Sequence, residues 1–144
     1  MTIPSYDVIF DIETNGFRRA GMAVHCIEAS LIGHNIEVFD LPALHRVLGI
    51  IVPTGKVIDT LIASRVLTAD RRELDALDPA MPVDLIGRHS LDSWGWRLKV
   101  RKDGFAHRQD QPWSAELQKH CELDTIISWA LFEHLTSIDA ELAA

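Results

Sequence analysis

A strand that carries two acids at its carboxyl end is the feature of this sequence that most constrains the fold. Residues 6–13 read YDVIFDIE, with apolar side chains at every second position, which is the periodicity of a strand. One face holds Val8, Phe10 and Ile12. Asp11 and Glu13 leave the strand together on the other face, because residues two apart share a face. Asn15-Gly16 then favours a turn.

Short apolar runs and helical patterns alternate along the rest of the chain. We expect strands at residues 30–33 and 56–58, and helices at residues 40–48, 60–67, 90–98 and 114–138. A helix at about residues 21–29 is also preferred, because two parallel neighbouring strands need a crossover of about a dozen residues. Residues 69–88 are charged and contain prolines, so a loop is expected there. This order predicts an α/β fold with a small, mainly parallel sheet flanked by helices.

Single residues at the helix ends support these boundaries. Asp40 and Asp59 are candidate caps for the helices at 40–48 and 60–67, because their carboxylates can accept hydrogen bonds from the first N–H groups. Gly49 can end the first of these helices. Trp94 falls on an apolar stripe and is expected in the core rather than stacked on a nucleic-acid base, whereas the role of Trp96 stays open.

The composition is that of an ordinary globular domain. The chain has 144 residues, of which 47% are hydrophobic and 24% charged, and this length suits a single domain over residues 1–144. No apolar run is long enough to cross a bilayer and the start lacks a signal-peptide layout, so we expect a cytoplasmic protein without membrane contact. Cys26 and Cys121 lie outside any metal-ligand spacing and are expected as reduced thiols.

The net charge of −7 argues against a protein that grips long duplex DNA, because that mode of binding needs an excess of Lys and Arg. It is compatible with an enzyme that holds phosphate through divalent cations clustered by its own carboxylates. Asp11 and Glu13 suit this reading, since like charges about 4 Å apart repel by roughly 4 kcal/mol at an effective dielectric near 20. A solvated face of an edge strand is the simpler alternative.

The last predicted helix points a further acid, Asp124, toward the core. Its apolar stripe runs through Leu117, Cys121, Asp124, Ile127 or Ser128, Leu131 and Leu135. His120 lies one turn before Asp124 on the same side. Burial of a carboxylate without a partner costs several kcal/mol, so Asp124 should have a metal or a strong hydrogen-bond partner. A stripe assigned one residue out of place is the alternative.

Asp40 is the third position of interest. It ends the segment GHNIEVFD, which follows the strand at 30–33 and contains Asn35 and Phe39. Taken alone, a helix cap explains this aspartate. Taken together, acids at strand ends, at the start of one helix and inside another converge on one crevice at the carboxyl edge of the sheet.

These motifs resemble the DEDD exonuclease superfamily, and most closely the exonuclease domain of family A DNA polymerases from bacteriophages. The matching pieces are DIETNG at 11–16, GHNIEVFDLPAL at 33–44, VIDTLIASRVL at 57–67, HSLDSWGWRL at 89–98 and HCELDTIISWALFEHL at 120–135. They follow the family's order and cover most of the chain. The resemblance implies a reduced RNase H-like fold and a 3′→5′ exonuclease domain. Such an enzyme hydrolyses phosphodiester bonds at the 3′ end of single-stranded DNA, in proofreading or in DNA replication and repair.

The resemblance also assigns residues to roles. Two Mg²⁺ or Mn²⁺ ions, about 3.5–4 Å apart, would be held by Asp11, Glu13, Asp40 and Asp124. Thr14 and Asn15 would lie against the 3′-terminal nucleotide, and Asn35 is a further candidate substrate contact. Lys99, Arg101 and Lys102 form a basic cluster that we expect to contact the substrate backbone, with a solvated loop as the alternative.

The sequence departs from the family at the residue that would act on water. In members of the family, either a Tyr is separated from the last Asp by three residues or a His is separated from it by four. Here three residues separate His120 from Asp124, so a histidine stands at the tyrosine's spacing. We interpret His120 as the group that orients or deprotonates the water, with His107 as a rival and Tyr6 too far upstream. Imidazoles ordinarily titrate near pH 6.5, so the rate should fall on acidification through about pH 6–7.

The second departure is length. Only 26 residues separate Glu13 from Asp40, too few for the further strands and helix of the full fold, so we expect a sheet of about three parallel strands. The uncovered edge of the strand at 6–13 could pair with a second copy or be covered by a separately encoded DNA polymerase. Residues 17–29, as a helix or a strand, could instead fold back over that edge.

Two other functions remain open from the sequence. One is a catalytically weak accessory domain that binds a polymerase or a nucleic-acid end, although all four acids of the motif are present. The other keeps the chemistry but acts on short RNA or oligonucleotides, since no reader of a 2′-hydroxyl can be recognised.

Overall fold

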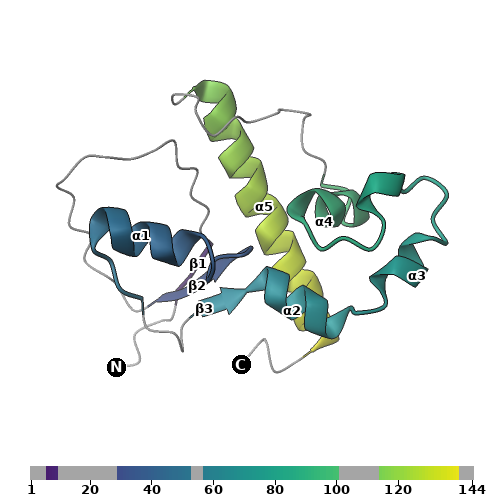
Figure 1. Ribbon diagram of the computed structural model, residues 1–144, viewed down its shortest axis with the longest axis horizontal. Coiled ribbons are helices and arrows are strands. Elements are labelled where there is room, and N and C mark those ends of the chain that lie inside the picture. The colour runs from purple at the N-terminus through teal and green to yellow at the C-terminus, as the bar shows by residue number, and fades with distance from the viewer. Residues whose placement is uncertain (1–5, 10–28, 53–56, 101–113, 140–144) are drawn as a thin grey trace.

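A computed structural model describes residues 6–9, 29–52, 57–100 and 114–139 (Figure 1). Within these residues one parallel sheet has the order β1 (Tyr6–Ile9), β2 (Ala29–Gly33), β3 (Val57–Asp59). The register pairs Val8 with Leu31 and Gly33 with Asp59. The α/β class is confirmed, and the described sheet has the three parallel strands expected from the short chain. The rest of the predicted first strand, and residues 17–28, lie outside the described ranges. Ala29, expected at the end of a helix over about residues 21–29, is instead the first residue of β2.

Five α-helices and one 3₁₀ turn complete the described part of the chain. They are α1 (Asp40–Leu48), α2 (Thr60–Leu67), α3 (Arg71–Asp75), η2 (Val83–Leu85), α4 (Leu91–Arg97) and α5 (Ala115–Ile138). The predicted helices at 40–48, 60–67, 90–98 and 114–138 are confirmed. No helix of the described residues is long and apolar enough to span a membrane.

Local chemistry explains where most helices begin and end. Ser90 and Ser114 accept hydrogen bonds from the backbone N–H groups of Ser93 and Leu117, and so cap α4 and α5. Gly49 ends α1 in the left-handed conformation, at φ 69°, and its N–H donates to the carbonyl of His45. This conformation strains a residue with a side chain, which is why glycine suits the position.

The predicted loop at residues 69–88 is wrong in part, since α3 and η2 lie inside it. Asp75 at the end of α3 is buried and receives both Nε (2.9 Å) and Nη2 (2.5 Å) of Arg97. The N–H of Gly87 donates to the same carboxylate at 2.8 Å. This charge-assisted network joins segments far apart in the sequence, so local patterns could not reveal it.

Helix α5 joins the two halves of the molecule. Figure 1 shows it running between the sheet with α1 on one side and α4 with α3 on the other, and it contacts β1, β2, α2 and α4. The main apolar cluster lies along it and consists of Trp94, Ile127, Leu131 and Leu135. Trp94 is fully buried, which confirms its predicted place in the core. Helix α5, which carries His120 and Asp124, is thus packed against both the sheet and the other helices.

Candidate functional site

Helix α5 carries an acid and an imidazole side by side. Asp124 is only 6% exposed and lies on the stripe with Leu117 and Ile127, as the sequence pattern predicted. The Nε2 atom of His120 is 3.7 Å from its Oδ2 atom, and the His120 side chain is itself 12% exposed. This distance is an ion-pair contact when the imidazole is protonated and exceeds that of a direct hydrogen bond. The pair can therefore share a proton through a small movement or a water molecule.

Asp40 is the first residue of α1 and is 3% exposed. Its predicted role as the helix cap is wrong. Phe39 occupies the cap position and provides no side-chain hydrogen bond. The chain enters α1 from a hydrogen-bonded turn, where Leu41 N–H donates to the carbonyl of Ile36 at 2.9 Å, so a side-chain cap is not needed. A carboxylate in the first helical turn is favoured by the helix dipole.

The turn before Asp40 is held by a residue whose part in the site the sequence did not reveal. Asp59 caps α2 as predicted, with Oδ1 accepting from the N–H groups of Leu61 and Ile62. The same carboxylate also accepts from the N–H groups of Asn35 (3.0 Å) and Glu37 (3.2 Å). The sequence identified Asp59 as a helix cap. Its bonds to Asn35 and Glu37 could not be predicted, because they depend on the pairing of β2 with β3.

Asn35 has a left-handed backbone, with φ 64°, a conformation that asparagine tolerates better than most residues. Its backbone N–H is committed to Asp59. The predicted substrate contact of its half-buried side chain stays a prediction.

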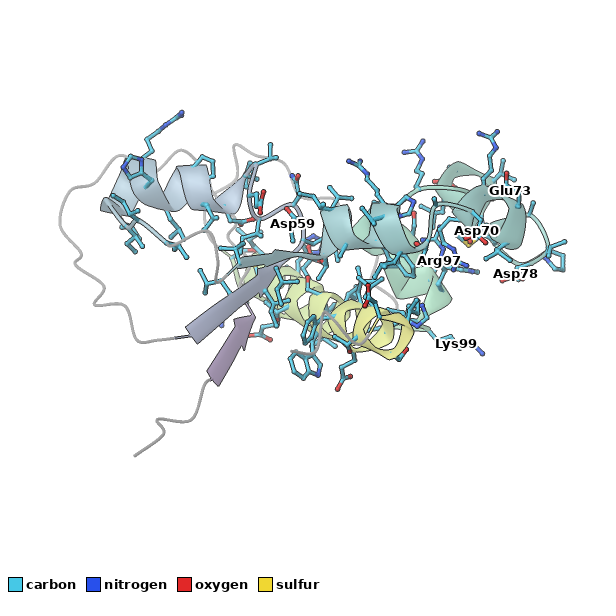
Figure 2. The ribbon with its side chains drawn as sticks, turned by 90° about the horizontal axis from the view of Figure 1, so that it is seen from below. Asp59, Asp70, Glu73, Asp78, Arg97 and Lys99 are labelled. Carbon is cyan, nitrogen blue, oxygen red and sulfur yellow. The ribbon has the colours of Figure 1, made fainter. Side chains whose placement is uncertain are left out.

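Lys99 is exposed and also left-handed, with φ 60°, just after α4. Figure 2 shows it at the helical end of the molecule, well separated from Asp59. The structure therefore does not bring Lys99 to the strand end where Asp59 lies. Its predicted partners in the basic cluster, Arg101 and Lys102, lie outside the described residues.

A shallow groove of about 340 Å³ lies beside β3 and α2. Its described lining comprises Glu37, Val57, Ile58, Asp59, Ile62, Ala63, Val66, Leu67 and Asp139. Six of these side chains are apolar and three are acidic. Such a lining repels phosphate, so this groove does not suit a nucleic-acid backbone.

Asp11, Glu13, Thr14, Asn15 and His107 also lie outside the described residues. Among the residues that are described, no three His, Cys, Asp or Glu side chains are grouped so as to hold a metal ion. Asp40 and Asp124, however, are carboxylates more than nine-tenths buried on separate helices, and hard oxygen ligands of this kind suit Mg²⁺ and Mn²⁺. The donor chemistry of the described residues therefore fits the predicted ions.

A scan against protein-family models finds no match, and a search of curated proteins finds no significant one.

Proposed function

We propose that this chain is a metal-dependent 3′→5′ exonuclease with a reduced RNase H-like fold, acting on the 3′ end of single-stranded DNA in proofreading, replication or repair. The observation that carries the proposal is the burial of Asp40 and Asp124, at 3% and 6% exposure, on two helices of an α/β fold. Carboxylates held on such helices are hard oxygen ligands of the kind that divalent ions prefer. The DIETNG motif at 11–16 would supply the other two ligands.

Four carboxylates and one histidine would each have a part in the hydrolysis. Two divalent ions held by Asp11, Glu13, Asp40 and Asp124 would supply an activated water and stabilise the leaving 3′ oxygen. His120 lies 3.7 Å from Asp124 and accepts a proton from water as a general base. The Asp124 carboxylate then stabilises the imidazolium that forms, because an opposite charge at this distance favours the charged form.

The same proposal includes a partner. A separately encoded DNA polymerase, or a second copy of this chain, would cover the outer edge of β1 and present the 3′ end. Light scattering at micromolar protein, alone and with a polymerase, tests this association.

The first prediction concerns the two described acids. Asp40→Asn and Asp124→Asn should each lower magnesium-dependent cleavage of an end-labelled DNA strand by about 100-fold or more, because each removes a carboxylate that holds the ions on which stabilisation of the transition state depends. The double variant should be little worse than either single one, since residues acting as a unit are not additive. Glu133→Gln makes the same change of charge on the exposed face of α5 and should leave the rate unchanged.

The assay is run on DNA and RNA strands, with and without Mg²⁺. Near-normal cleavage by Asp124→Asn, or equal cleavage in excess chelator, would overturn the proposal. Cleavage of RNA alone would keep the chemistry but replace the substrate. Absence of cleavage by the native chain under all conditions would favour an accessory binding domain.

A further inference from the structure

One carboxylate ties the end of β3 to the turn that precedes Asp40. Asp59 is 6% exposed and stands opposite Gly33 in the sheet register. Its Oδ1 atom accepts from the N–H groups of Leu61 (2.9 Å), Ile62 (3.3 Å) and Asn35 (3.0 Å), and Oδ2 accepts from that of Glu37 (3.2 Å). A helix cap needs only the first two of these bonds. The other two hold a different segment of the chain.

Thr60 strengthens the same junction. Its hydroxyl is fully buried and donates to the carbonyl of Gly33 at 3.2 Å. The Nδ1 atom of His34 lies 3.0 Å from the same Thr60 hydroxyl oxygen. Because the single hydroxyl proton goes to Gly33, the Thr60 oxygen is an acceptor for an Nδ1–H of His34. Asp59 and Thr60, at the junction of β3 with α2, thus bond to Gly33 at the end of β2 and to His34, Asn35 and Glu37 after it.

The held turn runs directly into α1. The carbonyl of Asn35 accepts from the N–H of Phe39 at 3.1 Å, and that of Ile36 accepts from Leu41 at 2.9 Å. Phe39 and Leu41 are the two neighbours of Asp40 in the chain. Ile36 is fully buried against Gly33, where an added Cβ would come within 2.9 Å of the Ile36 side chain. The position of Asp40 therefore follows from the position of this turn.

We propose that Asp59 is a positioning residue that fixes the Asp40 carboxylate through the turn at residues 35–39 and so sets the affinity of the site for divalent ions. This inference rests on the proposed function, in which Asp40 is a metal ligand. Asp59 itself does not touch the ions. Figure 2 shows Asp59 at the junction of β3 with α2. Outer partners that orient ligands typically change metal affinity by about 10–100-fold when they are removed.

The sharpest variant is Asp59→Asn. Asparagine is as good a helix cap as aspartate, so the N-terminus of α2 keeps its acceptor. Four N–H groups share the two oxygens of Asp59, so either orientation of the amide turns its NH₂ group against at least one of these donors. We expect the Mg²⁺ concentration for half-maximal cleavage to rise by about 10-fold or more. The rate at saturating Mg²⁺ should stay within about threefold of native.

Two measurements test the inference without cleavage. Calorimetric titration of Mn²⁺ should show the same loss of affinity in Asp59→Asn, and hydrogen exchange should become faster at the Glu37 amide while the amides of Leu61 and Ile62 keep their protection. Ser90→Ala, which removes the cap of α4, is the matched control and should leave the metal requirement unchanged. If Asp59→Asn does not fold, Thr60→Val removes the hydroxyl that joins Gly33 to His34 and should shift metal affinity in the same direction.

The outcomes separate this inference from the proposed function. Native chain that binds Mn²⁺ but cuts nothing overturns the exonuclease, while the titration still tests Asp59. An active enzyme whose Asp59→Asn variant has native metal affinity overturns the positioning role and leaves the exonuclease standing. A variant that loses rate at saturating metal with no change in affinity also overturns it, and so does a native chain that binds no divalent ion.

Discussion

At the residue scale, the buried acids of this molecule are stabilised in different ways. Asp75 receives a guanidinium fork and an amide N–H, and Asp59 receives four backbone N–H groups. Burial alone would raise the pKa of Asp75, but the hydrogen bonds and charge of Arg97 and the Gly87 amide outweigh it, so this pKa lies below its ordinary value. These two acids have evident structural duties. Asp124 differs from both in having an imidazole 3.7 Å away, which is the kind of neighbour that moves protons.

A prediction at this scale concerns His120. His120→Gln keeps a polar side chain of similar reach but cannot take up a proton, so cleavage at neutral pH should fall by about 100-fold, as for loss of a general base. The decline of the native rate on acidification should also disappear in the variant. The measurement is a pH–rate profile at saturating metal, with His45→Gln on the exposed face of α1 as the control. An unchanged rate and profile would transfer the role to His107 or to no side chain at all.

At the scale of elements, the sequence was sufficient to predict helix boundaries wherever hydrogen bonds between neighbouring residues set them. The boundaries of α1, α2 and α5 follow from Gly49, Asp59 and Ser114, whose chemistry can be read without knowing the fold. Helix α3 was missed because its support comes from Arg97, a residue more than twenty positions away. Asp40 was mistaken for a cap for the same reason, since the turn that replaces the cap is held from β3. The residue types of the candidate site could therefore be predicted from the sequence. The bonds from distant residues that hold them in place could be predicted only in part.

One glycine inside a helix and one at a helix end give a test at this scale. A Cβ added to Gly95 in α4 would lie 2.6 Å from the carbonyl oxygen of Val100 and 3.1 Å from Cδ1 of Ile127. Gly95→Ala should therefore destabilise the protein by about 1–3 kcal/mol through overpacking, despite the better helix propensity of alanine. Gly49 has nothing within 4 Å but a φ of 69°. Gly49→Ala should cost about 1–2 kcal/mol from the left-handed backbone alone.

Urea denaturation measures both effects, and two further variants separate them. Gly49→Asn should recover part of the loss at the end of α1, because asparagine tolerates the left-handed region. Gly95→Ser should be at least as harmful as Gly95→Ala, because only the space around Gly95 matters there. A stabilised Gly95→Ala variant would show that α4 can move away from α5, and that the core contact at Trp94 is looser than the structure indicates.

At the scale of the whole molecule, Trp94 is the point where distant segments meet. The guanidinium carbons of Arg97 and Arg71 lie 4.7 and 5.7 Å from the centre of its ring. The rings of His134 and His89 lie 5.7 and 6.2 Å from it. These residues come from α3, α4, α5 and the segment before α4, so the cluster holds the helical half together. It places two imidazoles beside two permanent cations.

This arrangement predicts how stability depends on pH. Burial lowers the pKa of His89, and the charges of Arg97, Arg65 and Arg71 lower it further; burial and then Arg71 lower the pKa of His134. In the unfolded chain imidazoles titrate near pH 6.5. Below that pH these two histidines therefore bind more protons in the unfolded chain than in the folded one. The contribution of these two histidines to the free energy of unfolding is fully present above about pH 6.5. It is lost as the pH falls from there through their lowered pKa values. For each histidine, a tenfold weaker proton affinity in the folded chain corresponds to a loss of about 1.4 kcal/mol.

Urea denaturation between pH 7.5 and 5 tests this expectation. His89 Nδ1 lies 3.0 Å from the Ser64 hydroxyl, so His89→Asn can keep that bond without taking up a proton, and His134→Gln is the corresponding change on α5. The native chain should lose stability across this range, and the double variant should lose clearly less. His45→Gln, which changes an exposed histidine away from Trp94, should follow the native curve. Parallel curves for the native chain and the double variant would place the acid sensitivity outside the Trp94 cluster.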